Sequence, residues 1–226
     1  MNNIAIITAR GGSKRIPNKN IKLFLGKPII AYSIIAALDS GLFNEVMVST
    51  DDHEIAKIAK EFGATVPFMR SAESADDYAI LNDVLLEVKN EYFKRNKEFD
   101  CACIILPTAP FITVELMNES FRMLISNNFD VVSPVVKYSY PIQRALKIGK
   151  DGKTKMFFPE YYKSRSQDLE PAYFDAGQFY WINKDKTLID SNRGSLIIPE
   201  TMAQDIDTPK DWEMAELKYR LLNIER

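Results

Sequence analysis

Short apolar segments alternate with segments of helical hydrophobic period along this chain, and that alternation constrains its fold more than any other feature. The apolar runs predict strands at residues 4–8, 45–49, 65–69, 101–106 and 131–136. The segments between them predict helices at residues 28–40, from Asp51 or Asp52 to residue 62, at 83–96 and at 114–127. Such repetition is typical of a parallel sheet with helices on both faces. We therefore predict an α/β, Rossmann-like three-layer fold with a mainly parallel sheet.

The alternation breaks at residues 138–172, which are rich in aromatic, Lys, Pro and Gln side chains without a clear period. An irregular surface insertion and an arm that packs on a second subunit both fit. We favour the arm, because its aromatic side chains need cover. Strands at 178–182 and 195–198 and a helix at 209–222, capped by Thr208 or Asp207, complete the expected fold. Residues 1–137 and 173–226 then form one α/β domain, into which residues 138–172 are inserted as a dimerisation arm.

Composition excludes several classes of protein. The net charge of −2 argues against a nucleic-acid binder, and no stretch approaches the roughly 20 apolar residues of a membrane span. Residues 4–7 are too short for the apolar core of a signal peptide. Cys101 and Cys103 lie two apart, as expected of buried thiols on one face of a strand in a reducing compartment. We expect a cytoplasmic protein without membrane or nucleic-acid contacts. One histidine, His53, offers little to a zinc site or a Ser–His–Asp hydrolase.

The loop that follows the first predicted strand is basic and rich in glycine. The first 38 residues contain six Lys or Arg side chains and no acid. Adjacent glycines let backbone N–H groups approach phosphate oxygens, and fixed cations neutralise them. Neither G-x-x-x-x-G-K-[ST] nor G-x-G-x-x-G is present, which argues against a P-loop kinase and a dinucleotide dehydrogenase. The loop predicts a polyphosphate site; a surface turn with solvated charges or a basic address signal is the alternative.

Two carboxylates stand near the C-terminus, at Asp205 and Asp207. In an extended segment they share a face, and Ile206 between them points into the core. Neighbouring carboxylates repel unless a cation or proton lies between them. Mg²⁺ accepts one or two carboxylates together with water and substrate phosphates, so the pair predicts an Mg²⁺ site, with Mn²⁺ as a possible substitute. The alternative is that Asp207 only caps the last helix and Asp205 is solvated.

These two features together resemble the CMP-sialic acid synthetase family of nonulosonic acid cytidylyltransferases. ARGGSKRIPNKN (9–20) is similar to the family's A-R-x-G-S-K-R/G-I-P-x-K-N, and DIDT (205–208) to its D-x-D-T. Arg70 with Asp76 and Asp77 is similar to R-P-x-x-L-A-x-D, although Ser71 and Ser74 replace Pro and Leu. LPTAPF (106–111) is similar to Q-P-T-S-P-L, with Leu106 in the place of Gln. The branch that activates pseudaminic acid is most similar, through PIQRAL (141–146), RSQDLEPAYFDAGQFYW (165–181) and QDIDTPKDWEMAELKY (204–219).

The resemblance implies a nucleotide-diphospho-sugar transferase type of fold. It also implies a reaction in which CTP and a nine-carbon sugar acid give a CMP-sugar and pyrophosphate. The implied catalytic residues are Arg10, Lys14, Lys19 and Asp207. The implied CTP-binding residues are Ala9, Arg10, Gly11, Gly12, Ser13, Lys14, Asn20, Arg70 and Ala79. The implied sugar-binding residues are Leu106, Arg144, Arg165, Gln167 and Asp175, and the implied metal ligands are Asp205 and Asp207.

In related enzymes the arm crosses to the partner subunit of a homodimer and supplies an Arg to the sugar carboxylate. Arg165 matches that motif position, and Arg144 is a second candidate. Either aspartate of the pair, or a metal-bound hydroxide, is a candidate acceptor of the sugar hydroxyl proton.

Two departures from the sialate pattern lie where the resemblance places the sugar pocket. Leu106 replaces Gln, and Asp175-Ala176-Gly177 replaces N-G. Both favour pseudaminic acid, which is deoxygenated at its terminal carbon. A sialate, legionaminate or ketodeoxyoctonate cytidylyltransferase stays an alternative. So does a non-catalytic nucleotide-binding protein, which would be expected to lose Lys19 or Asp207. A haloacid-dehalogenase phosphatase would need a D-x-D where Thr8-Ala9-Arg10 stands.

Overall fold

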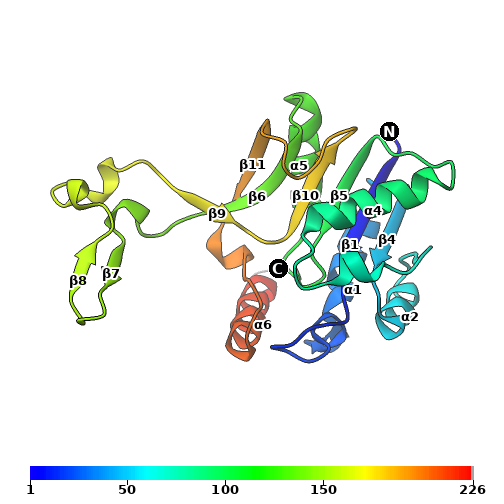
Figure 1. Ribbon diagram of the computed structural model, residues 1–226, viewed down its shortest axis with the longest axis horizontal. Coiled ribbons are helices and arrows are strands. Elements are labelled where there is room, and N and C mark those ends of the chain that lie inside the picture. Colours follow the sequence, from blue (N-terminus) through cyan, green and yellow to red (C-terminus); the bar gives the residue numbers. More distant parts are fainter. Residues whose placement is uncertain (225–226) are drawn as a thin grey trace.

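A central sheet carries the fold, and helices cover both of its faces (Figure 1). The computed structural model describes residues 1–224. The strands of the sheet are β1 (Asn3–Thr8), β4 (Glu45–Ser49), β5 (Cys101–Ile105), β6 (Val131–Lys137), β9 (Tyr173–Asp175), β10 (Phe179–Asn183) and β11 (Arg193–Ile198). The helices are α1 (Ile29–Asp39), α2 (His53–Glu61), α3 (Ala72–Ala75), α4 (Leu81–Phe93), α5 (Val114–Ser126) and α6 (Pro209–Ile224). The predicted α/β fold is confirmed.

The strand order is β11-β6-β10-β5-β1-β4, with β9 paired to β6. β1 is parallel to both β4 and β5, and β11 is parallel to β6. β10 runs antiparallel between β5 and β6, because the chain leaves the carboxyl end of β6 and returns into the sheet from that same edge. As a result, the first residue of β10, Phe179, is paired with the last residue of β5, Ile105. The segment that joins β9 to β10 therefore lies at the edge where parallel strands place their ligands.

Alternate residues of the strands face different helical layers, as the period of a strand requires. Ile4 and Ile6 of β1 pack with α4 on one face. Ala5 and Ile7 pack with α1, α2 and α5 on the other. All four side chains are buried. This double burial explains why the strands appear in the sequence as continuous apolar runs.

The helix caps that the sequence left open are decided by hydrogen bonds. The Asp52 carboxylate accepts from the backbone N–H groups of Glu54 and Ile55, at 2.7 and 3.1 Å, and so caps α2. At α6, the Thr208 hydroxyl accepts from the N–H of Asp211, and the Asp211 carboxylate accepts from the N–H of Thr208. This reciprocal pair is a capping box. The N–H of Asp207 also donates to Asp211, at 3.2 Å, but the Asp207 side chain takes no part in the cap.

The strand predicted at residues 65–69 is wrong. Only Thr65 bridges to β4: its N–H donates to Val46 O at 2.8 Å, and Val48 N–H donates to Thr65 O at 2.9 Å. Pro67 has no N–H to continue a ladder, so pairing ends there. The chain then follows the edge of β4 until the N–H of Arg70 donates to Thr50 O at 2.8 Å.

A small hairpin lies beside α1 and α6. It consists of β2 (Leu23–Phe24) and β3 (Lys27–Pro28), and a short 3-10 helix, η1 (Lys19–Ile21), precedes it. Phe24 is buried against α1 and Trp212 of α6, with ring centroids 5.6 Å apart. This cluster fixes α6 against the amino-terminal loop. No helix within the described 224 residues has the length and apolarity that crossing a membrane requires.

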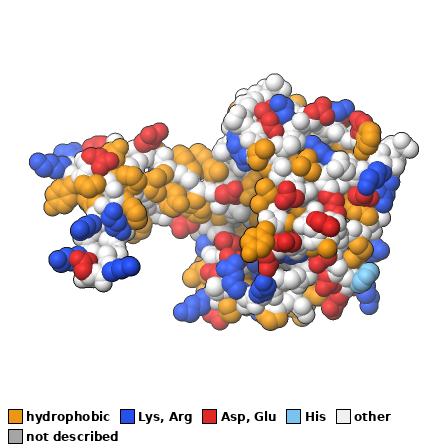
Figure 2. Space-filling view, viewed as in Figure 1, with side chains coloured by type: hydrophobic (Ala, Val, Ile, Leu, Met, Phe, Trp, Pro, Cys, Tyr) orange, Lys and Arg blue, Asp and Glu red, His pale blue; other side chains and the backbone are white. Residues whose placement is uncertain are grey.

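Residues 138–172 stand away from the sheet as an arm (Figure 1). Its far end is a hairpin of β7 (Leu146–Ile148) and β8 (Thr154–Met156), which the sequence pattern did not predict. Three 3-10 turns accompany it: η2 (Ile142–Arg144), η3 (Pro159–Tyr161) and η4 (Ser166–Asp168). Apolar side chains cover much of its visible face (Figure 2). Those exposed include Tyr140, Ile142, Leu146, Ile148, Phe157, Phe158 and Tyr162.

Candidate active site

The loop after β1 is held by contacts to β4 and to its own far end. The N–H of Ala9 donates to Ser49 O at 3.0 Å, and Asn20 Nδ2 donates to Arg10 O at 2.9 Å. The N–H of Gly11 donates to an Asp51 carboxylate oxygen at 2.9 Å. A Cβ on Gly11 would lie 2.8 Å from Asp52 Oδ2, so this approach requires glycine. A Cβ on Gly12 would meet nothing within 4 Å, so Gly12 leaves its backbone open to a ligand.

This loop encloses a cavity of about 460 Å³ with residues from the far end of the chain. The cavity is lined by Thr8, Arg10, Gly12, Ser13, Lys14, Arg15, Ile16, Lys19, Asn20, Asp77 and Asp207. The structure thereby brings together Arg10, Lys14, Lys19 and Asp207, the four residues predicted to be catalytic. It also places Gly12, Ser13 and Asn20 on the same wall.

Asp77 closes one side of the cavity by binding two cations of the loop. Its carboxylate lies 3.0 Å from Arg10 Nη1 and 2.5 Å from Lys14 Nζ. The hydrogen bond and charge of Lys14, with the charge of Arg10, hold the pKa of Asp77 below its usual range. Arg10 Nη1 also donates to Asp76 O at 2.9 Å. The segment that carries Asp76, Asp77 and Ala79 is thus tied to the basic loop.

Asp207 binds the other two cations. It lies 3.0 Å from Arg15 Nη2 and 3.5 Å from Lys19 Nζ. Lys19 Nζ also donates to Ile206 O at 2.6 Å, and four-fifths of its side chain is covered. Two carboxylates therefore hold four cations around one cavity. The oxygens of a polyphosphate are stronger partners for such cations, because they offer more charge and more acceptors.

The acidic pair flanks a buried residue, as the sequence predicted. Ile206 is 1% exposed, so Asp205 and Asp207 flank a residue anchored in the core. Loss of hydration and the charge of Asp207 raise the pKa of Asp205, and Lys19 opposes that shift. A divalent cation would relieve the repulsion, and carboxylate oxygens suit Mg²⁺. The described residues contain no group of three or more His, Cys, Asp or Glu side chains placed to hold a metal, so further ligands would come from phosphates and water.

Arg70 lies behind the loop, at the end of β4. Its Nε donates to Ser49 Oγ at 2.9 Å, and its Nη2 donates to Ser49 O at 2.6 Å. Burial lowers its pKa to about 10, against the opposing charges of Asp51 and Glu87. The guanidinium therefore stays charged at neutral pH. The chain runs on from Arg70 through α3 to Asp77, which lines the cavity, whereas Arg70 and Ala79 are not among its lining residues.

Two of the predicted sugar-binding residues meet at the carboxyl edge of the sheet. The N–H of Leu106 donates to Gln178 O at 2.8 Å, and Leu106 Cδ1 lies 4.0 Å from the position of a Cβ on Gly177. Asp175, at the end of β9, accepts from the N–H of Gly177 at 2.7 Å. Leu106 and Asp175 thus both lie against the turn at Gly177.

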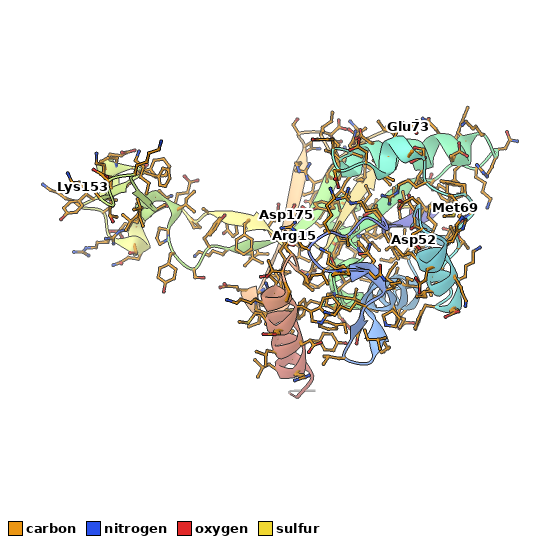
Figure 3. All side chains as sticks on the ribbon, turned by 60° about the horizontal axis from the view of Figure 1, so that its bottom comes forward. Arg15, Asp52, Met69, Glu73, Lys153 and Asp175 are labelled. Atoms are coloured by element: carbon orange, nitrogen blue, oxygen red, sulfur yellow. The ribbon has the colours of Figure 1, made fainter. Side chains whose placement is uncertain are left out.

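The other three, Arg144, Arg165 and Gln167, lie in the arm. Arg144 Nη1 donates to Ser166 Oγ at 3.3 Å. Figure 3 shows Asp175 at the base of the arm and Lys153 at its far end, on the side away from the body. The structure does not bring these three residues to the cavity of their own chain. A contribution from them requires a second subunit.

Three residues of the site were not predicted. Asp51 holds Gly11, Asp77 holds Arg10 and Lys14, and Tyr180 donates from its hydroxyl to Asp175 at 2.9 Å. The position of Asp51, two residues after the strand predicted at 45–49, was a usable signal. Asp77 belongs to the motif that contains Arg70, but its partners depend on tertiary contacts.

Comparison with known proteins identifies the family. The model of the family described as cytidylyltransferase matches residues 4–208. The chain belongs to the cytidylyltransferase family. The resemblance noted in the sequence is thereby confirmed, and this cytidylyltransferase is a nucleotidyltransferase. A pseudaminic acid cytidylyltransferase from Campylobacter jejuni is 40% identical over 98% of this chain and 97% of its own length. A CMP-N,N'-diacetyllegionaminic acid synthase from Legionella pneumophila is 33% identical over 98% of this chain and 97% of its own.

A solved structure supports the fold of this cytidylyltransferase. A CMP:2-keto-3-deoxy-manno-octonic acid synthetase complexed with CTP superposes with a TM-score of 0.73 over the full length of both chains. The two sequences are 19% identical, so this likeness bears on the fold alone. It confirms the nucleotidyltransferase type of α/β fold.

Proposed function

We propose that this cytidylyltransferase converts CTP and pseudaminic acid to CMP-pseudaminic acid and pyrophosphate. The observation that carries the proposal is the similarity to relatives named for that sugar: the one described above and a second from Campylobacter jejuni, 39% identical over 98% of this chain. A CMP-legionaminic acid synthase is the second candidate, because the Legionella relative covers the chain equally well at 33% identity.

In this proposal the CTP phosphates take the place of the carboxylates that now hold the loop cations. Arg10 and Lys14 exchange Asp77 for phosphate oxygens, and Lys19 neutralises charge beside Asp207. The anomeric hydroxyl of the sugar acid attacks the α-phosphorus, and the new oxygen–phosphorus bond forms as the bond to the pyrophosphate oxygen breaks. The hydroxyl proton passes to a carboxylate or to water. Positioning and charge stabilisation supply most of the rate in such phosphoryl-type transfers.

We propose Asp205 and Asp207 as ligands of Mg²⁺, or of Mn²⁺ in its place. When bound, the cation would offset negative charge on the phosphates and on the two carboxylates. The charge of Asp207 adds to the loss of hydration that raises the pKa of Asp205, and a cation between the two carboxylates would oppose both effects, which supports this assignment.

Leu106 and the Asp175–Gly177 turn support the choice of sugar. Leu106 offers no hydrogen bond, so a sugar hydroxyl placed against it would lose one made to water. A buried unpaired polar group costs roughly 1–3 kcal/mol. A sugar acid deoxygenated at its terminal carbon avoids that cost.

We also propose that the chain works as a homodimer in which the arm crosses to the partner subunit. The exposed aromatic side chains of the arm support this, since such a surface is rarely left uncovered. Arg165 and Arg144 would then reach the partner's sugar site. The two cysteines are buried and free, which suits the reducing cytoplasm in which we place the reaction.

The decisive experiment is a coupled assay of pyrophosphate release with CTP, Mg²⁺ and a panel of purified sugar acids. The panel holds pseudaminic, N-acetylneuraminic, legionaminic and ketodeoxyoctonic acids. We expect the highest kcat/KM with pseudaminic acid, by up to a few hundredfold over N-acetylneuraminic acid. Equal values would reject the assigned sugar and leave cytidylyl transfer intact. A protein that binds CTP and releases no pyrophosphate with any of the acids would instead be a nucleotide-binding protein.

A further inference from the structure

Both carboxylate oxygens of Asp175 are engaged by the protein itself. One accepts from the N–H of Gly177 at 2.7 Å, and the other accepts from the hydroxyl of Tyr180 at 2.9 Å. The residue belongs to the turn that joins β9 to β10, where Gly177 adopts a φ of +62°. The carboxylate therefore closes the turn and holds the side chain that follows it.

The hydrogen of the Tyr180 hydroxyl is committed to Asp175. An ionised carboxylate can only accept, so Tyr180 must be the donor in this bond. What the phenol oxygen offers to any other group is its lone pairs. Partial burial, the charge of Asp175 and this hydrogen bond all raise the pKa of Tyr180, so the phenol stays neutral.

Tyr180 lies beside the site proposed for the sugar. β10 begins at the carboxyl edge of β5, directly after the turn that packs against Leu106. Tyr180 itself is paired with Ile104 of β5, two residues before Leu106. The side chain is half-buried and not sealed in the core.

We propose that Asp175 is a positioning residue that makes Tyr180 a pure hydrogen-bond acceptor toward the sugar acid. The site then selects a substrate that presents a donor, a hydroxyl or amide N–H, to the phenol oxygen, with the apolar wall of Leu106 beside it. The inference rests on the proposed function of the site. It assigns Asp175 to the protein side of the pocket and gives direct contact with the sugar to Tyr180.

Asp175→Asn reverses the direction of the hydrogen bond between residue 175 and Tyr180 with almost no change of shape. The amide oxygen keeps the N–H of Gly177, so the amide nitrogen faces Tyr180 and donates to it. The hydroxyl hydrogen of Tyr180 must then point away from residue 175 and toward the sugar. There it faces the sugar's own hydrogen-bond donor, and two donors repel. We expect KM for the sugar acid to rise about tenfold or more, with KM for CTP within about twofold of wild type.

Tyr180→Phe keeps the inference testable should Asp175→Asn fold poorly. It removes the acceptor, so KM for the sugar acid should rise similarly. The double variant should be no worse than Tyr180→Phe alone, because Asp175 acts through Tyr180. Asp190→Asn is the matched control: Asp190 likewise accepts from a backbone N–H and a hydroxyl, both of Thr187, in a turn at the opposite edge of the sheet. It should leave both KM values unchanged.

The assay uses whichever sugar acid the wild-type protein turns over best. The identity of that acid tests the proposed function, whereas the change in its KM tests this inference. An unchanged sugar KM in Asp175→Asn or in Tyr180→Phe overturns the inference. Equal rises in both KM values together with a fall in Tm would also overturn it, because they would mark Asp175 as structural. A double variant in which the two losses add would overturn it as well.

Discussion

The ammonium nitrogen of Lys19 lies 3.5 Å from a carboxylate oxygen of Asp207, although 188 residues separate the two along the chain. The contact joins the basic loop after the first strand to the acidic pair before the last helix. The buried cluster of Phe24 and Trp212 fixes the two segments beside one another. The basic loop and the acidic pair are thereby held at one place.

Lys19→Ala and Arg10→Ala should each lower kcat/KM by about 10²–10³ without unfolding the protein. A charge-assisted contact to phosphate oxygens that gain charge in the transition state contributes on the order of 2–4 kcal/mol. Steady-state kinetics with CTP and circular dichroism of each variant check this. Lys60→Ala, on the exposed face of α2, is the control. Near-wild-type kinetics in both variants would reject the polyphosphate site.

Asp77→Asn should lower Kd for CTP by about two- to fivefold. In the ligand-free protein Asp77 competes with the phosphates for Arg10 and Lys14, and its neutral analogue competes less. The effect is small because solvent screens ion pairs this exposed. Titration of CTP binding by calorimetry, in buffers of two ionic strengths, measures it. Weaker binding in the variant would show instead that Asp77 assists the nucleotide.

Asp205→Asn should raise the Tm of the metal-free protein at pH 7 by about 1–3 °C. The folded-state pKa of Asp205 is raised, so the folded protein loses stability as pH rises from the ordinary value near ~3.9 through that raised value. The asparagine removes this loss at neutral pH, and the difference in Tm should vanish toward pH 3. Differential scanning calorimetry across pH checks the sign.

Mg²⁺ should stabilise wild type and not Asp205→Asn or Asp207→Asn, and both variants should lose most of their activity. Catalysis by wild type should stop in excess EDTA and return with Mg²⁺ or Mn²⁺. Undiminished turnover in EDTA, or an equal rise in Tm of both variants on adding Mg²⁺, would count against the metal site.

Mixing an Arg165→Ala chain with a Lys19→Ala chain should restore part of the activity that each lacks alone. In a mixed dimer one site has an intact loop and receives Arg165 from the partner, so up to about one site in four of a random mixture is complete. Light scattering should report a dimer at micromolar concentration. Lys153→Ala, at the tip of the arm, can replace Arg165→Ala as a control that keeps its activity. A monomer, or no recovery on mixing, would argue that the arm acts within its own chain.

Much of the fold and of the basic loop could be predicted from the sequence, because both depend on neighbours along the chain. Strands buried on both faces appear as continuous apolar runs, and β4 was predicted at its exact bounds of Glu45–Ser49. The capping residues Asp52 and Thr208 act within three residues of themselves. The loop after β1 could be recognised by its adjacent glycines and its excess of positive charge. For the same reason the strand predicted at residues 65–69 was wrong: the segment has the apolar pattern of a strand, but Pro67 has no N–H to donate to β4.

What could not be read from the sequence depends on contacts between segments far apart in the chain. The direction of β10 follows from the edge at which the arm returns to the sheet. The pairing of Asp77 with Arg10 and Lys14 spans more than 60 residues, and no periodicity records it. The sequence resemblance named Asp175 as sugar-binding, but its hydrogen bonds with Gly177 and Tyr180 follow from the turn between β9 and β10. The sequence determines which side chains are present, whereas tertiary packing determines which partner each of them binds.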